Sequence, residues 1–187
     1  MRNPARHRRA LRRFCGDRRG VSAVEFALIL PIMVVLYLGS VELGNGLAVQ
    51  FKTTLAARTV ADLTSQYQTI DATTMTQILG AASSVVTPYS ATNMTVIVSE
   101  VTTINANGSA TVTWSAANSG NARTVGSPIT LPSALQTLPT GTSLILGEVT
   151  YPFNPQFGYV LTGSINMYES QYFYPRKASC VSYNSVC

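Results

Sequence analysis

The feature that most constrains this chain is an apolar run near its N-terminus. Residues 26–41 contain no charged residue, and the wider segment Val21–Val41 is apolar apart from Glu25 and two serines. At 1.5 Å per residue these 21 residues would form a helix roughly 31 Å long, about the thickness of the hydrocarbon core of a bilayer. A buried helix of a soluble protein is the alternative, but the length and the lack of charge favour a transmembrane helix.

The charge of the chain is concentrated before this helix. Residues 1–19 hold eight arginines and one aspartate, whereas the rest of the chain has five basic and seven acidic residues. Because basic residues accumulate on the cytoplasmic side of membrane helices, we expect a cytoplasmic N-terminus and export of everything after about residue 45. A nucleic-acid-binding arm is the alternative, since arginines bind phosphate well. The adjoining membrane segment argues against it, and we expect no nucleic-acid partner.

Helical periodicity continues beyond the apolar run. Apolar residues recur at Leu43, Leu47, Phe51, Leu55, Val60, Leu63 and Tyr67, with charged residues off this line. This pattern predicts one helix over about 21–67, roughly 70 Å long, with its first half in lipid and an amphipathic second half against a globular head. Pro31 removes a backbone donor inside the helix and predicts a kink there.

The remaining residues predict a short helix and a small antiparallel sheet. Residues 72–85 are expected to form the helix, with Asp71 as its N-cap and Pro88 after its end. Alternating apolar residues predict strands near 94–99, 110–116, 144–151 and 163–174, with a turn at Asn107-Gly108 and a long loop over 117–143. The predicted fold class is therefore α+β, with a basic leader at 1–20, a long helix at 21–67 whose transmembrane half is about 21–44, and a periplasmic head at 68–187.

Two cysteines near the C-terminus carry a redox prediction. Cys180 and Cys187 are separated by six residues. In an oxidising periplasm they can close a small intramolecular disulfide, while unpaired thiols and an intermolecular bridge remain the alternatives. The only histidine is His7, far from both, so we expect no metal site.

No sequence signature of catalysis was found. The chain has no P-loop, no Gly-x-Ser-x-Gly elbow and no Gly-rich dinucleotide fingerprint. The three glutamates of the predicted head, Glu100, Glu148 and Glu169, are isolated in sequence. A glycosidase-like pair among them is one interpretation, but solvated or strand-edge charges are favoured. We therefore expect neither an enzyme nor a cofactor.

The junction between leader and helix is the most informative stretch. A secretory signal peptide is cut after its apolar region, where Ser40 and Gly44 offer a poor site. A cut before the apolar region, after Gly20, would instead leave the helix in the mature chain, with Val21 first and Glu25 fifth. A carboxylate on a lipid-facing helix costs roughly 2.5 kcal/mol or more at mid-bilayer and less near the interface, so Glu25 needs a partner. The alternative is that Glu25 is simply a glutamate one turn into a helix, where the macrodipole and the nearby arginines favour it.

The residue sequence of this junction resembles the N-terminus of TadE/TadG-like proteins, the pseudopilins of tight-adherence (Flp) pilus systems. In that family a basic leader meets a Gly-x-x-Ala-x-Glu-Phe-Ala-x-x-x-Pro run. The chain matches it at Gly20, Ala23, Glu25, Phe26, Ala27 and Pro31. The ending Tyr172-Phe173-Tyr174-Pro175-Arg176-Lys177 is similar to the aromatic-Pro-Arg ending of TadE-like chains. The modest length and the lack of an Asp-x-Ser-x-Ser run favour the TadE-like branch over the TadG members that carry a von Willebrand-type domain.

The resemblance implies a function. The chain would be a minor pilin or pseudopilin with a pilin-like fold, cleaved between Gly20 and Val21 by a prepilin peptidase and taking part in assembly of an Flp type IV pilus that supports adhesion and biofilm formation. Glu25 would meet the new α-amine of Val21 on a neighbouring subunit. The implied partners are the bacterial inner membrane, the peptidase, other pilins or pseudopilins and the assembly machinery. An uncleaved, single-pass membrane-anchored periplasmic binding module is the alternative.

Overall fold

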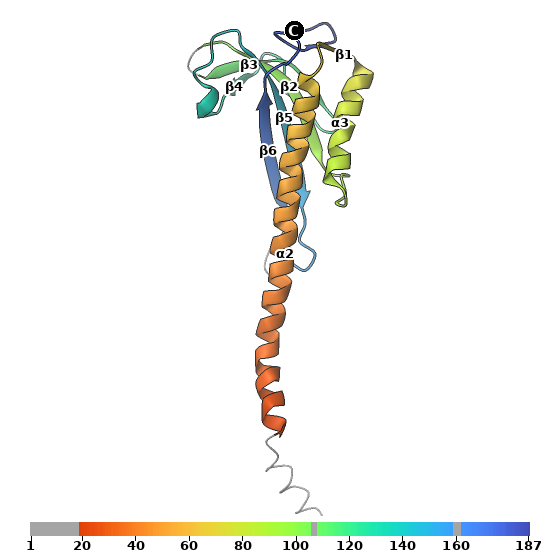
Figure 1. Cartoon of the computed structure of the whole chain (residues 1–187), viewed down its shortest axis with the longest axis vertical. Coiled ribbons are helices and arrows are strands. Elements are labelled where there is room, and N and C mark those ends of the chain that lie inside the picture. Colours follow the sequence, from red (N-terminus) through yellow and green to blue (C-terminus); the bar gives the residue numbers. More distant parts are fainter. Residues whose placement is uncertain (1–18, 106–107, 159–161) are drawn as a thin grey trace, which may run out of the picture. The chain divides into compact units, whose positions relative to one another are not determined.

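The computed structural model describes residues 19–105, 108–158 and 162–187 (Figure 1). Most of the predicted leader, and Asn107 of the predicted turn, lie outside these ranges. The fold is α+β, as predicted: a long N-terminal apolar helix, a short second helix and a curled antiparallel sheet. Contacts divide the chain into two compact units. The N-terminal unit contains the chain up to Leu43 together with Gln156–Thr162, and the head unit contains Gly44–Pro155 and Gly163–Cys187. The domain boundaries given above remain predictions.

The first helix, α2, runs from Arg19 to Ser65 without interruption. Its bounds agree with the predicted helix to within two residues at each end. Pro31 lies inside it, where its ring nitrogen cannot donate to the carbonyl one turn earlier. The kink predicted at this position stays a prediction.

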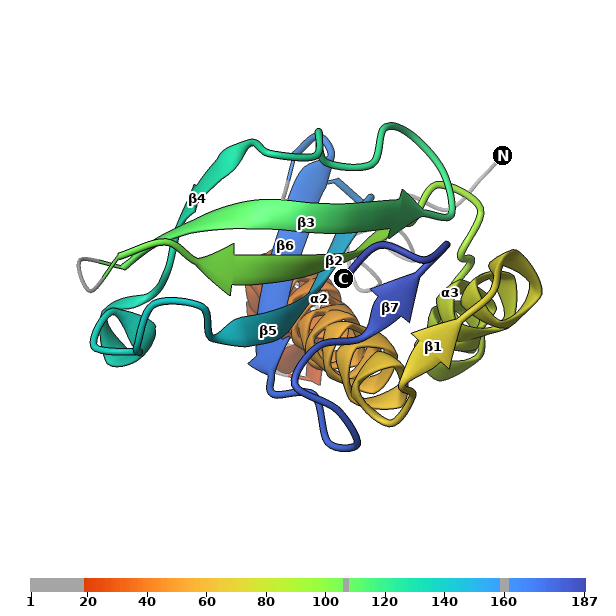
Figure 2. The same ribbon diagram turned by 90° about the horizontal axis from the view of Figure 1, so that it is seen from above.

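The second helix, α3, covers Ala72–Val86 and starts at the expected cap. The backbone N–H of Thr74 donates to Oδ1 of Asp71 over 2.7 Å, which satisfies one of the free amides of the first turn and lowers the pKa of Asp71. The face that α3 buries consists of Met75, Ile78, Leu79, Ala82 and Val86. Within the head unit, α3 and the part of α2 after Gly44 lie beside the sheet (Figure 2).

The sheet has five strands, and every neighbouring pair is antiparallel. In chain order they are β2 (Thr95–Thr103), β3 (Ser109–Ala117), β4 (Pro128–Thr130), β5 (Ser143–Phe153) and β6 (Ile165–Phe173). Their order across the sheet is β4-β3-β2-β5-β6. Short β1 (Thr69–Ile70) and β7 (Ser182–Tyr183) pair in parallel and form a second, two-stranded sheet.

One predicted segment was wrong. Residues 117–143 were expected to form a loop, but they contain β4 and a 3-10 turn, η1 (Ser133–Leu135). Strand β4 has only three residues and begins with a proline, so its sequence shows too little alternation to predict a strand. These residues become a strand because β3 supplies hydrogen-bond partners along its outer edge, where Ala110 pairs with Ile129.

The packing of α2 on the sheet also differs from expectation. Within the head unit, α2 buries Val60 of the predicted line, but its other buried apolar residues are Val49, Ala56, Ala57 and Ala61. Gly147 of β5 faces the alanines: a Cβ built on it would lie 2.6 Å from the carbonyl oxygen of Ala57 and 2.9 Å from the Cβ of Ala61. Small side chains on both elements let the helix approach the sheet closely. Leu47, Phe51 and Leu55 of the predicted line stay exposed on the outer side of the helix.

The two faces of the sheet carry separate apolar clusters. Ile145 and Gly147 point toward α2, so Leu144 and Leu146 point to the other face. There they pack with residues beneath β4 and η1 in a cluster formed by Val101, Ala110, Val112, Leu131, Leu144 and Leu146. The pairing of β2 with β3 shifts its register between Glu100 and Val101. On β3, the residues that face α2 lie on one side of this shift, and the residues of the second cluster lie on the other.

Candidate assembly helix

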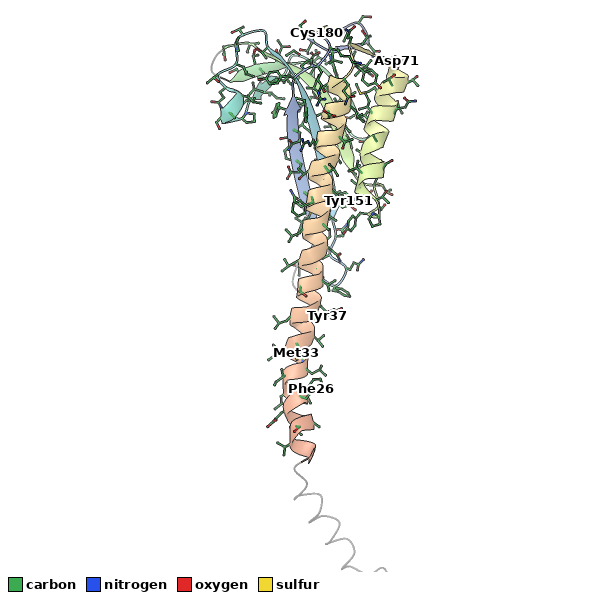
Figure 3. All side chains as sticks on the ribbon, in the orientation of Figure 1. Phe26, Met33, Tyr37, Asp71, Tyr151 and Cys180 are labelled. Atoms are coloured by element: carbon green, nitrogen blue, oxygen red, sulfur yellow. A yellow bond between two sulfur atoms is a disulfide. The ribbon has the colours of Figure 1, made fainter. Side chains whose placement is uncertain are left out.

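The N-terminal half of α2 is apolar and uncovered on every side. Each residue from Gly20 to Tyr37 is exposed, and the side chains of Phe26 and Met33 project from the helix (Figure 3). Large exposed hydrophobic residues in this stretch are Val21, Val24, Phe26, Leu28, Ile29, Leu30, Ile32, Met33, Val34, Val35, Leu36 and Tyr37. Within the described residues, the only helix long and apolar enough to span a membrane is this one. It could anchor the protein in a membrane.

The predicted cleavage bond lies at the beginning of this helix. Gly20 and Val21 both belong to its first turn, and nothing lies within 4 Å of a Cβ built on Gly20. Val21 is 53% exposed. The bond is therefore open to an enzyme in the isolated chain, and its cleavage stays a prediction.

Glu25 lies one helical turn after Val21 and is exposed. Among residues 19–105, 108–158 and 162–187, no side chain or backbone group forms a hydrogen bond or an ion pair with its carboxylate. It is thus an acidic group on an otherwise apolar surface. Its proposed pairing with an α-amine requires a second subunit.

The outer face of α2 continues the apolar surface toward the head. We call Leu43, Leu47, Phe51 and Leu55 the outer stripe. These side chains are 52%, 62%, 73% and 50% exposed, respectively. Spaced four residues apart, they lie on one side of a helix, opposite the alanines that contact β5. The outer stripe is a surface suited to another helix.

A shallow pocket of about 300 Å³ lies at the C-terminal end of the outer stripe. It is lined by Leu55, Arg58, Thr59, Asp62, Leu63, Phe173 and Arg176. A guanidinium N–H of Arg176 donates to Oδ1 of Asp62, and the backbone N–H of Arg176 donates to the carbonyl of Ser65 over 2.8 Å. The aromatic-Pro-Arg ending noted in the sequence thus holds the chain after β6 against the end of α2.

Glu100 and Glu148 are buried, so the prediction of solvated or strand-edge charges was wrong for these two, whereas Glu169 lies on the edge strand β6. Glu100 is fully buried, and it accepts hydrogen bonds from Trp114 Nε1 at 2.7 Å, from the Val181 backbone N–H at 3.0 Å and from the Ser143 hydroxyl. Burial raises the pKa of Glu100 above its usual 4.5, and these hydrogen bonds partly oppose that rise.

Glu148 has a separate set of partners on the face of the sheet away from α2. It is 4% exposed and accepts hydrogen bonds from Arg123 Nε at 2.5 Å, from Arg123 Nη2 at 2.6 Å and from the Tyr168 hydroxyl at 2.5 Å. Burial and the bond to Glu148 raise the pKa of Tyr168 to about 12. This bidentate pair fixes the loop after β3 to the sheet.

Glu169 of β6 accepts a hydrogen bond from Gln50 of α2. Glu100, Glu148 and Glu169 therefore serve three different structural contacts, and the structure does not bring any two of them together as a pair. Within the described part of the chain, no group of His, Cys, Asp or Glu side chains could hold a metal ion.

The C-terminal segment is held beside Glu100. The Sγ atoms of Cys180 and Cys187 are bonded, with their Cα atoms 5.9 Å apart. Trp114 Nε1 also donates to the carbonyl of Val181 over 2.7 Å, and its ring lies 5.4 Å from that of Tyr183. Sequence reasoning missed this arrangement. Its signal was a single glutamate within an apolar strand, which is costly unless the carboxylate has partners.

Comparison with known proteins connects the N-terminal part of the chain to one family. Residues 20–62 match the family model described as TadE-like protein. The matched range begins at the predicted cleavage bond and includes Glu25, Pro31 and the outer stripe. No curated protein and no solved structure matches the chain. The TadE/TadG-like resemblance is confirmed for this range and points to a protein associated with a Tad pilus.

Proposed function

We propose that this chain, TadE-like over residues 20–62, is a minor pilin or pseudopilin that takes part in assembly of a tight-adherence (Flp) type IV pilus. The observation that carries the proposal is helix α2. It is apolar on all sides from Gly20 to Tyr37, and it keeps an exposed apolar stripe through Leu55. A helix that only anchored a head would need the first part but not the second.

The topology follows from charge and length. The arginines before α2 stay in the cytoplasm, residues of about 21–44 cross the inner membrane, and the head lies in the periplasm. The disulfide between Cys180 and Cys187 fits an oxidising compartment. Assembly then carries the subunit toward an extracellular pilus that supports adhesion and biofilm formation.

A prepilin peptidase cuts after Gly20 in this proposal. The cut removes the positive leader and creates a new α-amine at Val21. Glu25 of a neighbouring subunit accepts that amine, because both groups are charged and neither is favourable in lipid without a partner. The open surroundings of Gly20 and the lack of a described partner for Glu25 support this step.

The outer stripe receives an apolar helix of another pilin-type subunit. Full burial of a leucine or phenylalanine side chain contributes about 1.5–3 kcal/mol. Since half or more of each stripe side chain is exposed, covering all four would contribute on the order of 4 kcal/mol. The uncleaved binding module is the alternative function; it predicts an intact N-terminus and gives the stripe no partner.

The experiment that tests this proposal is intact-mass and N-terminal determination of the protein extracted from membranes of its native host. The wild-type chain should begin at Val21. Gly20→Ala should retain the leader, whereas Gly44→Ala should be processed normally, because Gly44 is also a helical glycine with nothing within 4 Å of a Cβ. Recovery of wild-type protein that still carries residues 1–20 from cells with an active prepilin peptidase would reject the proposal in favour of the binding module.

A further inference from the structure

A buried carboxylate lies at the end of the apolar half of α2. Glu42 is 2% exposed. Its Oε1 accepts the backbone N–H of Phe157 over 2.9 Å and that of Gly158 over 2.6 Å. Both donors belong to the loop between β5 and β6, and both groups lie in the N-terminal unit. Glu42 therefore fixes this loop to the helix, which the sequence pattern did not reveal.

Two glycines lie beside this contact. Gly158 has a φ of +66°, a left-handed conformation that favours glycine. Gly39, almost one turn before Glu42, is buried as well. Hydrogen bonds to an ionised carboxylate are about twice as strong as bonds between neutral groups. The loop is thus held at one defined level along α2.

That level can be placed relative to a membrane. Glu42 follows Val21 by 21 residues, which corresponds to roughly 31 Å of helix and so to the outer edge of the hydrocarbon core. Phe157 is held there with 44% of its side chain exposed. Residues 149–168 contain no charged side chain. Trp and Tyr concentrate at this boundary in membrane proteins, and Phe is common on the apolar face of helices that lie in it.

We propose that the loop around Phe157 and Gly158 is a second membrane contact, in which Glu42 fixes the backbone and Phe157 enters the interfacial layer of the lipid surface. This inference rests on the proposed transmembrane topology of α2. Lipid is the favoured occupant because the loop is continuous with the apolar helix surface and lies within the same compact unit. Such a contact would restrict how the chain tilts and rotates about its single membrane helix.

The test places a tryptophan at the loop in the full-length chain. Phe157→Trp is reconstituted in phosphatidylcholine and phosphatidylglycerol vesicles, with and without brominated acyl chains, which quench nearby indoles. Tyr37→Trp reports on the membrane helix. Tyr174→Trp, which is 51% exposed in the head unit, is the matched control. The native Trp114 is 3% exposed and gives the common background. Phe157→Trp should lose more emission than Tyr174→Trp, and Tyr37→Trp should also be quenched.

The possible results distinguish the proposed loop contact from the proposed membrane helix. Quenching of Tyr37→Trp with no more loss at position 157 than at 174 overturns the loop contact and leaves the membrane helix standing. No quenching at either 37 or 157 rejects both. Protection of position 157 that grows with the protein-to-lipid ratio assigns the loop to a subunit contact and also overturns the lipid proposal.

A second pair of variants tests the role of Glu42. Combined with Phe157→Trp, Glu42→Gln keeps an acceptor oxygen for the two amides, whereas Glu42→Ala removes it. Quenching at position 157 should fall in the alanine variant and persist in the glutamine variant. Equal quenching in both would show that Glu42 does not position the loop.

Discussion

The close contact between α2 and β5 gives a stability prediction that can be worked from distances. In Gly147→Ala, the new Cβ would lie 2.6 Å from the carbonyl oxygen of Ala57, 2.9 Å from the Cβ of Ala61 and 3.2 Å from its backbone nitrogen. Two of these obstacles are backbone atoms of a helix, which cannot rotate away as a side chain can. The helix or the strand must therefore move.

The expected magnitude combines two opposing effects. Replacing glycine by alanine in a strand interior favours the folded state by roughly 0.5–1 kcal/mol, while forcing extra volume into a packed core costs about 1–3 kcal/mol. The second effect dominates because the contacts are far below van der Waals distance. We expect a net loss of about 1–2 kcal/mol for Gly147→Ala and a larger loss for Gly147→Val.

The measurement is urea unfolding of the full chain in detergent micelles, followed by emission of Trp114, which is 3% exposed in the folded protein. With an m value of about 1–3 kcal/mol per molar urea, the midpoint of Gly147→Ala should fall by roughly 0.5–1 M. Gly80→Ala is the control, because Gly80 lies in α3 with nothing within 4 Å of a Cβ. That variant should be more stable by up to about 1 kcal/mol. If Gly147→Ala matches or exceeds wild type, α2 does not approach β5 as described.

Three further predictions concern the outer stripe and the C-terminal contacts. Phe51→Glu should change the unfolding free energy by less than about 0.5 kcal/mol but abolish crosslinking to pilus subunits in the native host. The control Gln77→Glu, at an exposed position on α3, should leave crosslinking intact. Retained crosslinking in Phe51→Glu would show that the outer stripe is not part of the interface. Glu100→Ala should cost about 1–3 kcal/mol because Trp114 and Val181 lose an acceptor, and Glu100→Gln should cost less. Because burial raises the pKa of folded Glu100, its contribution is complete below the unfolded value and is lost as pH rises through the folded pKa. Wild type should therefore lose stability relative to Glu100→Gln as the pH rises above the usual glutamate pKa of 4.5; a pH-independent difference would contradict this. Cys180→Ser should cost about 2.5 kcal/mol, the chain-entropy value for a loop of this length, and unchanged unfolding midpoints with and without reductant would show that the bridge does not form.

Local elements were predictable because their signals are local. The N-cap signal at Asp71 and the proline at position 88 identified α3 within one residue, and the alternation over 110–116 identified β3. Both patterns depend on spacing along a single segment. The pairing of β1 with β7 was not predictable, since two strands of two residues have no periodicity. They form only because α2 and the C-terminal segment bring Ile70 and Tyr183 together.

The buried face of α2 could not be read from the pattern. Periodicity shows which residues avoid water, but it does not show what covers them. The outer stripe was the stronger apolar signal, yet the sheet selected the small residues Ala57 and Ala61, because only they allow contact with Gly147. The outer stripe is regularly spaced and exposed in the single chain, so it is free to pack against a helix of another subunit.

The candidate site was partly predictable. Gly20, Glu25 and Pro31 belong to a contiguous motif, so the sequence alone could identify them. Glu42 could not be assigned a role, because its partners Phe157 and Gly158 are more than 100 residues away in the chain. Glu100 was misjudged for the same reason: Val181, which supplies a donor, lies 81 residues later.

The position of the C-terminal segment has a consequence for the order of folding. The last strand, β7, pairs with β1 at the far end of α2, and Val181 completes the hydrogen bonds of both Glu100 and Trp114. In the proposed topology the head leaves the cytoplasm in chain order after α2, so β2, β3 and β5 reach the periplasm before Val181 does. Contacts between residues this far apart in the sequence form slowly. Until Val181 is in place, Glu100 and Trp114 each lack one of their buried hydrogen-bond partners, so we expect the segment around Val181 to complete the head.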